Sequence, residues 1–276
     1  MTAKADAMIP NVLTLAGVDP SGGAGTVADV KAMSANGAYA CAIIAALTAQ
    51  NTKGVSGIHA APPEFIRLQI DTLFADVRID AVKIGMLGGE RAIAAVAERL
   101  MHWKPARIVI DPVMIAKSGD ALLERVAIGA LREALLPLAS VMTPNLPEAG
   151  VLLELRPPED LKEMRRYAER LRNAMAHDGE RWVLLKGGHL TSGDAIDILH
   201  DGDRMIELDA PRIDTKNTHG TGCTLSSALA ALLPQCADVP DAAKRAKAYL
   251  TKALANADRL DVGKGHGPVH HFHAFW

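Results

Sequence analysis

The stretch Asn217-Thr218-His219-Gly220-Thr221-Gly222-Cys223 stands directly before a run of small and leucine residues, 224–233, that predicts a buried helix. Two glycines at a helix entrance leave the first backbone N–H groups of the helix pointing outward, with the positive end of the helix dipole behind them. The stretch therefore predicts an anion-binding site with Cys223 beside the bound charge. The alternative is a glycine-rich loop that only turns the chain, and signals elsewhere favour the anion site.

Composition narrows the class of protein. The chain has 276 residues, 49% of them hydrophobic, which predicts one domain spanning 1–276. A net charge of −2 gives no indication of nucleic acid or of an anionic membrane surface as a partner. No apolar run approaches the roughly 20 residues that span a bilayer, and residues 1–8 lack the apolar core of a signal peptide. Three scattered cysteines favour neither a disulfide framework nor a zinc site, so we expect a cytoplasmic protein.

Apolar strand patterns alternate with helical patterns along most of the chain. Strands are predicted at Val12–Ala16, Tyr39–Leu47, Ala81–Ile84, Arg107–Ile110, Ser140–Met142 and Trp182–Leu185, with a hairpin formed by Ala195–His200 and Arg204–Leu208. Helices are predicted at Thr26–Ala35, Pro62–Phe74, Glu90–Met101, Glu124–Leu135, Pro158–Ala176, Thr224–Leu233 and Pro240–Ala257. Such alternation predicts an α/β fold with a central, mostly parallel sheet and helices on both faces.

Polar and glycine-rich segments follow the predicted strands. They are 17–25, 48–52, 85–86, 111–113, 143–148 and 186–188. Ligands of open α/β sheets bind at the carboxyl ends of the strands. These segments are therefore the expected binding site.

Two carboxylates in these segments, Asp111 and Glu148, are predicted to lie near a magnesium ion. Mg²⁺ prefers oxygen ligands and usually keeps several waters beside one or two carboxylates. Asp111 could instead be a turn former. Glu148 could instead stabilise the first turn of a helix that Asn145 caps.

Lys186, at a strand end before two glycines, is placed to neutralise phosphate charge, although taken alone it would be interpreted as an ordinary solvated lysine. Backbone donors, a cation and metal-holding carboxylates are what phosphoryl transfer requires, since that reaction depends on positioning and charge neutralisation. The chain has neither the G-x-x-x-x-G-K-[ST] pattern of P-loop proteins nor the G-x-G-x-x-G of dinucleotide sites. The sequence thus predicts a phosphotransferase of another type.

Cys223 is predicted to lie nearest the attacking hydroxyl and to act as its general base or as its positioner, and a helix N-terminus is expected to lower the thiol pKa. His219, four residues upstream, could lower that pKa further, or could simply form local hydrogen bonds in its loop. Cys41 lies in an apolar strand and is predicted to be a buried apolar residue.

The ordered motifs carry a resemblance over essentially the whole chain. They are Ala16–Gly25, Thr48–Thr52, Lys83–Met86, Asp111–Gly119, Thr143–Glu148, Lys186–His189, Asn217–Cys223 and the ending Val262–Trp276. In these motifs the sequence resembles the hydroxymethylpyrimidine/phosphomethylpyrimidine kinases of the ribokinase-like superfamily. The resemblance implies a three-layer αβα fold, a homodimer, ATP and Mg²⁺, and phosphorylation of a pyrimidine alcohol in thiamine biosynthesis.

The resemblance also implies residue roles. Gln50 would pair with the pyrimidine edge, with Gly17, Asp29 and Met86 around the ring. Gly220, Thr221 and Gly222 would form the anion hole, and Cys223 stands where most sugar kinases of the superfamily have an aspartate base. On the phosphate and ATP side it implies Lys186, Asn217 and Lys247.

One site is expected to phosphorylate first the alcohol and then its monophosphate. The second step brings two anionic phosphates together, so it needs additional positive charge. Lys117 could supply that charge, or be a solvated lysine on a loop. The alternative functions are a pyridoxal kinase, because some relatives with this cysteine motif act on pyridoxal-type alcohols, and a non-catalytic module that binds a vitamin precursor.

Overall fold

The computed structural model describes residues 8–114, 125–176, 178–190 and 193–276. Within these residues a nine-stranded sheet has the order β3-β2-β1-β4-β5-β6-β7-β8-β9. The strands are β1 (Asn11–Val18), β2 (Tyr39–Asn51), β3 (Gly54–Ala60), β4 (Ala81–Ile84), β5 (Ile108–Ile110), β6 (Val141–Met142), β7 (Trp182–Leu185), β8 (Asp197–His200) and β9 (Met205–Leu208). The helices are α1 (Gly25–Ala35), α2 (Pro63–Phe74), α3 (Glu90–Trp103), α4 (Arg125–Ala130), α5 (Leu146–Leu153), α6 (Leu161–Asn173), α7 (Thr221–Leu232) and α8 (Val239–Ala255).

The six strands from β2 to β7 in the sheet order pair in parallel, as predicted. At the edges, β3, β8 and β9 pair antiparallel, and β8–β9 is the predicted hairpin. The segment 48–52, predicted to follow a strand, is largely strand, since β2 continues to Asn51. β3 is absent from the predicted strands because it is mostly exposed and so carries little hydrophobic pattern.

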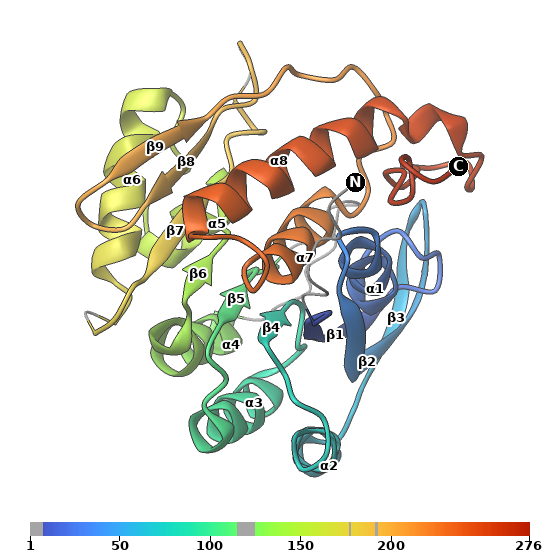
Figure 1. Ribbon diagram of the computed structural model, residues 1–276, viewed down its shortest axis with the longest axis vertical. Helices are drawn as coiled ribbons and strands as arrows, with labels where there is room; N and C mark the ends of the chain where they lie inside the picture. The colour runs from blue at the N-terminus through green and yellow to red at the C-terminus, as the bar shows by residue number, and fades with distance from the viewer. Residues whose placement is uncertain (1–7, 115–124, 177, 191–192) are drawn as a thin grey trace.

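Helices cover both faces of the sheet, which gives the expected three layers (Figure 1). Successive side chains of a strand point to opposite faces of the sheet, so each strand contributes to a core on each face. Leu13 and Leu15 of β1 belong to the core that includes residues of α2, α3, α5 and α6. Val12, on the opposite side of the same strand, joins the core with α1, α7 and α8. A period of two on strands that are buried on both faces explains why both cores are aliphatic.

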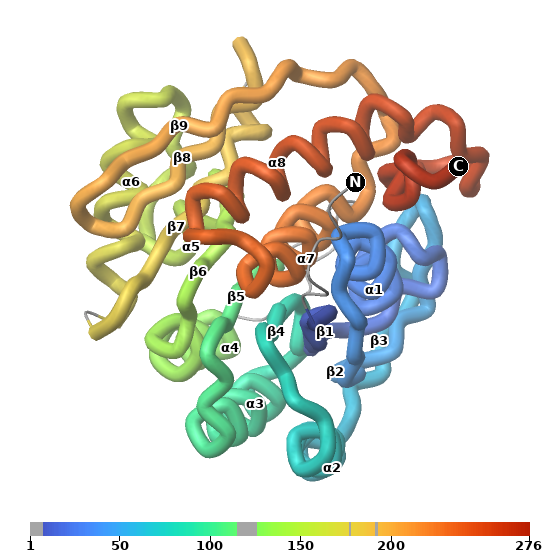
Figure 2. Tube along the Cα trace, in the orientation of Figure 1, coloured from blue at the N-terminus to red at the C-terminus, as the bar shows by residue number. Residues whose placement is uncertain are grey.

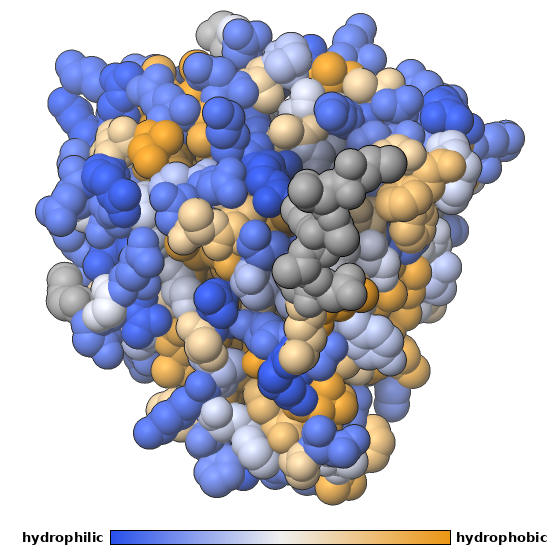
Figure 3. Space-filling view, in the orientation of Figure 1, coloured by the Kyte–Doolittle hydropathy of each residue, from blue (hydrophilic) through white to orange (hydrophobic). Residues whose placement is uncertain are grey.

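The C-terminal segment returns to the body of the molecule next to α1 (Figure 2). The amide of His266 donates to the Thr52 carbonyl oxygen at 2.9 Å, just beyond the end of β2. Hydrophilic side chains cover much of the face that α6 and α8 present (Figure 3). None of the helices in the described ranges is both long enough and apolar enough to cross a membrane.

Candidate active site

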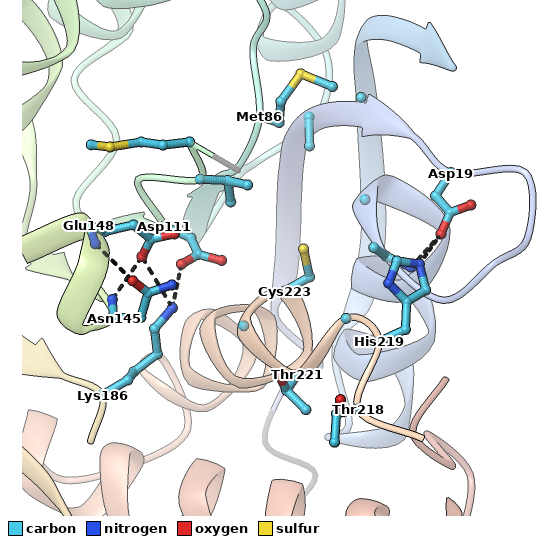
Figure 4. A pocket seen from close by; sticks show the side chains of 18 of the residues that line it. Asp19, Met86, Asp111, Asn145, Glu148, Lys186, Thr218, His219, Thr221 and Cys223 are labelled. Carbon is cyan, nitrogen blue, oxygen red and sulfur yellow. Dashed lines mark hydrogen bonds and ion pairs between the residues drawn. The ribbon is translucent and has the colours of Figure 1, made fainter. Parts of the chain in front are cut away.

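A cavity of about 350 Å³ opens at the carboxyl ends of the central parallel strands, in front of α7 (Figure 4). Its volume lies in the range of small-molecule sites, roughly 300–1,000 Å³. The structure brings most of the predicted residues to this one cavity. Those lining it are Gly17, Gln50, Met86, Asp111, Glu148, Lys186, Gly220, Thr221, Gly222 and Cys223.

Gly220 shapes the entrance of α7. It is the residue before the helix and has a φ of +75°, a left-handed conformation that favours glycine. A Cβ atom at Gly220 would lie 1.7 Å from the carbonyl oxygen of Gly23, so a side chain has no room there. Gly222 and Cys223 follow in the first turn, where backbone amides have no acceptor inside the helix. Amide donors and the positive end of the α7 dipole therefore meet the cavity, as an anion hole requires.

Asp111 and Lys186 form a buried ion pair beside these amides. The Lys186 Nζ atom is 2.8 Å from Asp111 Oδ1 and 3.9 Å from Glu148 Oε2. A Cβ atom on Gly222 would lie 3.3 Å from Lys186 Nζ and 3.4 Å from Asp111 Oδ2. A group bound at the first turn of α7 would thus lie next to both the cation and the carboxylate.

The pKa values of the two carboxylates shift in opposite directions. Burial by itself would raise the pKa of Asp111, but the Lys186 and Lys83 charges hold it below its ordinary value. Burial raises the pKa of Glu148 and the neighbouring Asp111 charge adds to the rise, against the opposing effect of Lys186. Glu148 also completes the predicted cap of α5, since its amide donates to Asn145 Oδ1 at 2.8 Å.

The residues present fit Mg²⁺ held largely through water. Asp111 and Glu148 both approach Lys186, and a pair of carboxylates is the usual protein contribution to a Mg²⁺ site that also uses phosphate oxygens. Among the described residues no group of three or more His, Cys, Asp or Glu side chains could hold a metal by itself.

The thiol of Cys223 differs from the sequence expectation. Burial is the largest effect and raises its pKa to about 11; the Lys83 charge and the Gly25 backbone lower the pKa, and the Asp29 and Asp111 charges raise it. The expected lowering of the thiol pKa by the helix N-terminus is therefore wrong for this structure, because desolvation is the larger effect. The His219 side chain hydrogen-bonds to Asp19 and is not among the groups that shift the pKa of the Cys223 thiol. At neutral pH Cys223 is a protonated thiol.

The opposite end of the cavity has features suited to a small ring. The Gly17 amide donates to the Met86 carbonyl oxygen at 2.9 Å. A Cβ atom on Gly17 would lie 2.6 Å from Met86 Cε, so glycine allows the methionine side chain to lie against the loop. The hydroxyl of Thr48 lies 2.8 Å from the Val18 carbonyl oxygen and 3.2 Å from Gln50 Oε1.

Asp29 is not part of the cavity wall, so its expected contact with the ring is corrected. Its carboxylate is fully buried and lies 2.8 Å from the ammonium of Lys83, which does line the cavity. Asp29 also accepts hydrogen bonds from Thr14 at 2.6 Å and Ser227 at 2.7 Å. The aspartate therefore anchors a buried lysine instead of meeting a ligand, because four donor contacts saturate its oxygens.

Asn217 and Lys247 likewise do not line the cavity. The side-chain amide of Asn217 donates to Asp258 Oδ1 at 2.7 Å. Lys247 forms a nearly buried ion pair of 2.6 Å with Asp197 and donates to the Ala195 carbonyl oxygen at 2.7 Å. Asp197 in turn accepts from the amide of Gly187, next to Lys186. Their expected direct contact with ATP is not supported by these positions.

Lys117 lies outside the described residues, so its role stays a prediction. The residues that sequence reasoning missed are Lys83, Thr48 and Asp19. A charged residue at the centre of the apolar run Ala81–Ile84 was a usable signal for Lys83, because an unpaired lysine is almost never fully buried. Thr48 and Asp19 stand in the segments 48–52 and 17–25 that were expected to form the site, but no local pattern assigns either a role, since their partners are distant in sequence or on the backbone.

Asp19 and His219 meet at the rim of the cavity, as Figure 4 shows. The His219 Nε2 atom is 2.7 Å from Asp19 Oδ2. Burial would raise the pKa of Asp19, but hydrogen bonds from His219 and Ser21 hold it below the ordinary value. Because a carboxylate can only accept, Nε2 of His219 carries the proton.

Comparisons with known proteins agree on one family. Residues 19–270 match the family model described as phosphomethylpyrimidine kinase. A hydroxymethylpyrimidine/phosphomethylpyrimidine kinase of Escherichia coli (strain K12) is 52% identical over 266 residues, covering 96% of this chain and 98% of the relative.

Two solved structures extend the similarity to three dimensions. A phosphomethylpyrimidine kinase from Clostridium difficile 630 has a TM-score of 0.77 and 38% identity, over 89% of this chain and 99% of that one. An ADP complex of Bacillus subtilis pyridoxal kinase has a TM-score of 0.87 and 32% identity, over 96% of this chain and 98% of that one.

Proposed function

Because this chain belongs to the phosphomethylpyrimidine kinase family, we propose that it uses ATP to phosphorylate 4-amino-5-hydroxymethyl-2-methylpyrimidine to the monophosphate and then to the diphosphate, in thiamine biosynthesis. The relative from Escherichia coli carries both kinase activities in its name and is matched over 98% of its length. The ADP complex of a structurally similar pyridoxal kinase supports the use of a nucleotide.

The observation that carries the proposal is the close approach of an anion hole, a cation and a carboxylate. Gly222, in the first turn of α7, lies against both Lys186 Nζ and the Asp111 carboxylate. Phosphoryl transfer requires charge neutralisation of the transferring group and little covalent chemistry. In this proposal the α7 amides and Lys186 hold that group, and the protonated thiol of Cys223 positions the attacking hydroxyl.

Mg²⁺ is part of the proposal. When bound, it would neutralise phosphate charge and be held through Asp111 and Glu148 with water. Lys186 already lies between these carboxylates, so the protein balances their charge before any nucleotide arrives. We expect Asp111→Asn to remove most turnover while the protein still binds the pyrimidine.

The ring end of the cavity supports an aminopyrimidine. The side-chain amide of Gln50 offers a donor and an acceptor together, which matches an amino group beside a ring nitrogen. Gly17 and Met86 line the same cavity. A homodimer is a further prediction that follows from the family resemblance, and a cytoplasmic location and a single domain are predictions that follow from composition.

The deciding experiment is turnover of ATP by the purified protein with Mg²⁺ and one acceptor at a time: the pyrimidine alcohol, its monophosphate, and pyridoxal. We expect phosphorylation of the first two. Transfer to pyridoxal alone would indicate a pyridoxal kinase, and binding of the pyrimidine without ADP formation would indicate a binding module.

Lys117→Ala, assayed with alcohol and monophosphate separately, should impair the second step more than the first. Equal losses in both steps would remove Lys117 from that role.

A further inference from the structure

Two loops meet at the cavity although they are distant in sequence. The glycine-rich loop, residues 19–24, joins β1 to α1, and the anion-hole loop, residues 217–220, precedes α7. The bond of 2.7 Å between His219 Nε2 and Asp19 Oδ2 joins them, and both side chains are nearly buried, at 6% and 3% exposure. A buried, charge-assisted hydrogen bond of this length is among the stronger kinds.

Both partners of this bond are held rigidly. Asp19 accepts from the Ser21 amide at 2.8 Å and from the Ala24 amide at 3.0 Å, which fixes the carboxylate on its own loop. The amide of His219 donates to the Gly267 carbonyl oxygen at 3.0 Å. Its ring packs closely against the other loop, since a Cβ atom on Gly23 would be 2.3 Å from His219 Cδ2.

The two loops carry different halves of the reaction. The glycine-rich loop continues from the end of β1, where Gly17 lines the cavity and contacts Met86, whereas Gly220 of the other loop precedes the amides that would hold phosphate. Transfer requires the attacking oxygen to sit within about 3–3.5 Å of phosphorus and in line with the leaving group. The relative position of the two loops therefore sets the distance between acceptor and donor.

We propose that Asp19 and His219 are positioning residues: their bond keeps the acceptor half of the site in register with the phosphate half, so that the phosphoryl group reaches the bound alcohol instead of water. This inference rests on the proposed kinase function and extends it. Each half-site would bind its ligand without the bond, but the two ligands would no longer be aligned.

His219→Ala is the test, with the His59→Ala protein as matched control because His59 is exposed on β3, away from the cavity. We expect kcat for phosphorylation of the alcohol to fall by up to about 100-fold, the loss associated with a displacement on the order of 1 Å. The dissociation constants of the alcohol and of a non-hydrolysable ATP analogue, measured calorimetrically, should change little. The ratio of ADP formed to phosphorylated product should rise, because water replaces the misaligned alcohol.

His219→Gln distinguishes alignment from general damage. A glutamine amide can place an N–H donor close to the position of Nε2, so this variant should recover part of both kcat and the coupling ratio. His219→Ala with unchanged kcat and coupling would overturn the inference. So would a His219→Ala protein that folds, by its melting temperature, but has lost affinity for either ligand in proportion to its loss of kcat. Parent enzyme that phosphorylates neither the alcohol nor the monophosphate would overturn the proposed function instead.

Discussion

Single charged residues at the cavity are organised by burial and pairing. Lys83 is fully buried, and although burial alone would lower its pKa, the Asp29 carboxylate raises that pKa above the ordinary value. Asp111 is kept ionised by Lys186 in the same way. A buried charge without a partner costs several kcal/mol, so these side chains can be charged at this buried position only because they are paired. Cys223 stays a neutral thiol because burial, the largest effect on it, raises its pKa to about 11.

Gln50→Leu tests the residue assigned to the pyrimidine edge. Leucine has similar volume but no amide, so a bound aminopyrimidine would lose its partners at a cost of roughly 1–3 kcal/mol, about 5- to 150-fold in affinity. Calorimetric titration with the alcohol measures this, and affinity for an ATP analogue should not change. Equal binding of the alcohol by parent and variant would show that Gln50 does not contact it.

Alkylation of Cys223 tests the state of the thiol. With a pKa raised to about 11, the reactive thiolate is scarce at pH 7 and increases as pH rises toward that value. In a Cys41→Ala/Cys236→Ala background, the iodoacetamide rate followed by mass spectrometry should be slow at pH 7 and climb about tenfold per pH unit up to pH 9. Urea-unfolded protein provides the reference rate. Fast labelling near pH 7 that levels off with pH would mean that the helix N-terminus dominates after all.

At the scale of elements, the end of β7 is fixed from the side away from the cavity. Asp197, at the start of β8, binds Lys247 of α8 and also accepts from the Gly187 amide at 2.9 Å. A Cβ atom on Gly187 would lie 1.9 Å from the Ile196 carbonyl oxygen, so the chain after β7 packs tightly on the β8 side. Lys247 of α8 therefore helps to position Lys186, because its partner Asp197 holds the amide of the next residue, Gly187.

Lys247→Met should destabilise the fold, since it leaves Asp197 buried without its cation. Removing one partner of a buried pair costs about 3–5 kcal/mol, measurable by urea denaturation. Adding Asp197→Asn should restore much of the loss, because the asparagine oxygen can still accept from Gly187 without a charge. A Lys247→Met protein of normal stability but raised KM for ATP would instead support the direct ATP contact predicted from sequence.

At the scale of the whole molecule, the C-terminal segment holds the anion-hole loop in place. The Gly267 carbonyl oxygen accepts from the His219 amide, and Gly267 packs against Asn217 at the start of the loop. The segment is anchored further on by His271, whose Nε2 lies 3.1 Å from Thr224 Oγ1 of α7. The C-terminal segment thus supports the loop and the helix whose amides form the predicted anion hole.

Deleting residues 263–276 should impair both stability and turnover. The deletion exposes surface covered by the buried Val269 and His271 and removes hydrogen bonds to α7 and α8, a loss on the order of 4 kcal/mol. Thermal unfolding and kcat measure the two effects. Deletion of 275–276 is the control, because Phe275 and Trp276 are 67% and 62% exposed. Full turnover in the longer deletion would show that the anion-hole loop needs no support from the tail.

The sequence alone determined what depends on local pattern. Strand and helix periodicity gave the parallel core of the sheet, and glycines before a helix gave the anion hole, because these features arise from neighbouring residues. The segments at strand ends also predicted where Asp111, Glu148 and Lys186 would meet.

Only the tertiary structure decided which polar residues face the cavity and what charge they carry. Asp29 and Lys247 are residue types that often bind ligands, yet each forms an ion pair with a residue of another element. Asp29 pairs with Lys83, 54 residues away, and Lys247 pairs with Asp197. The Asp19–His219 bond joins residues 200 apart, and Cys223 has a raised pKa because burial outweighs the local effect of its helix. Pairing and desolvation depend on what the folded chain brings together from all sides, and no local pattern records that.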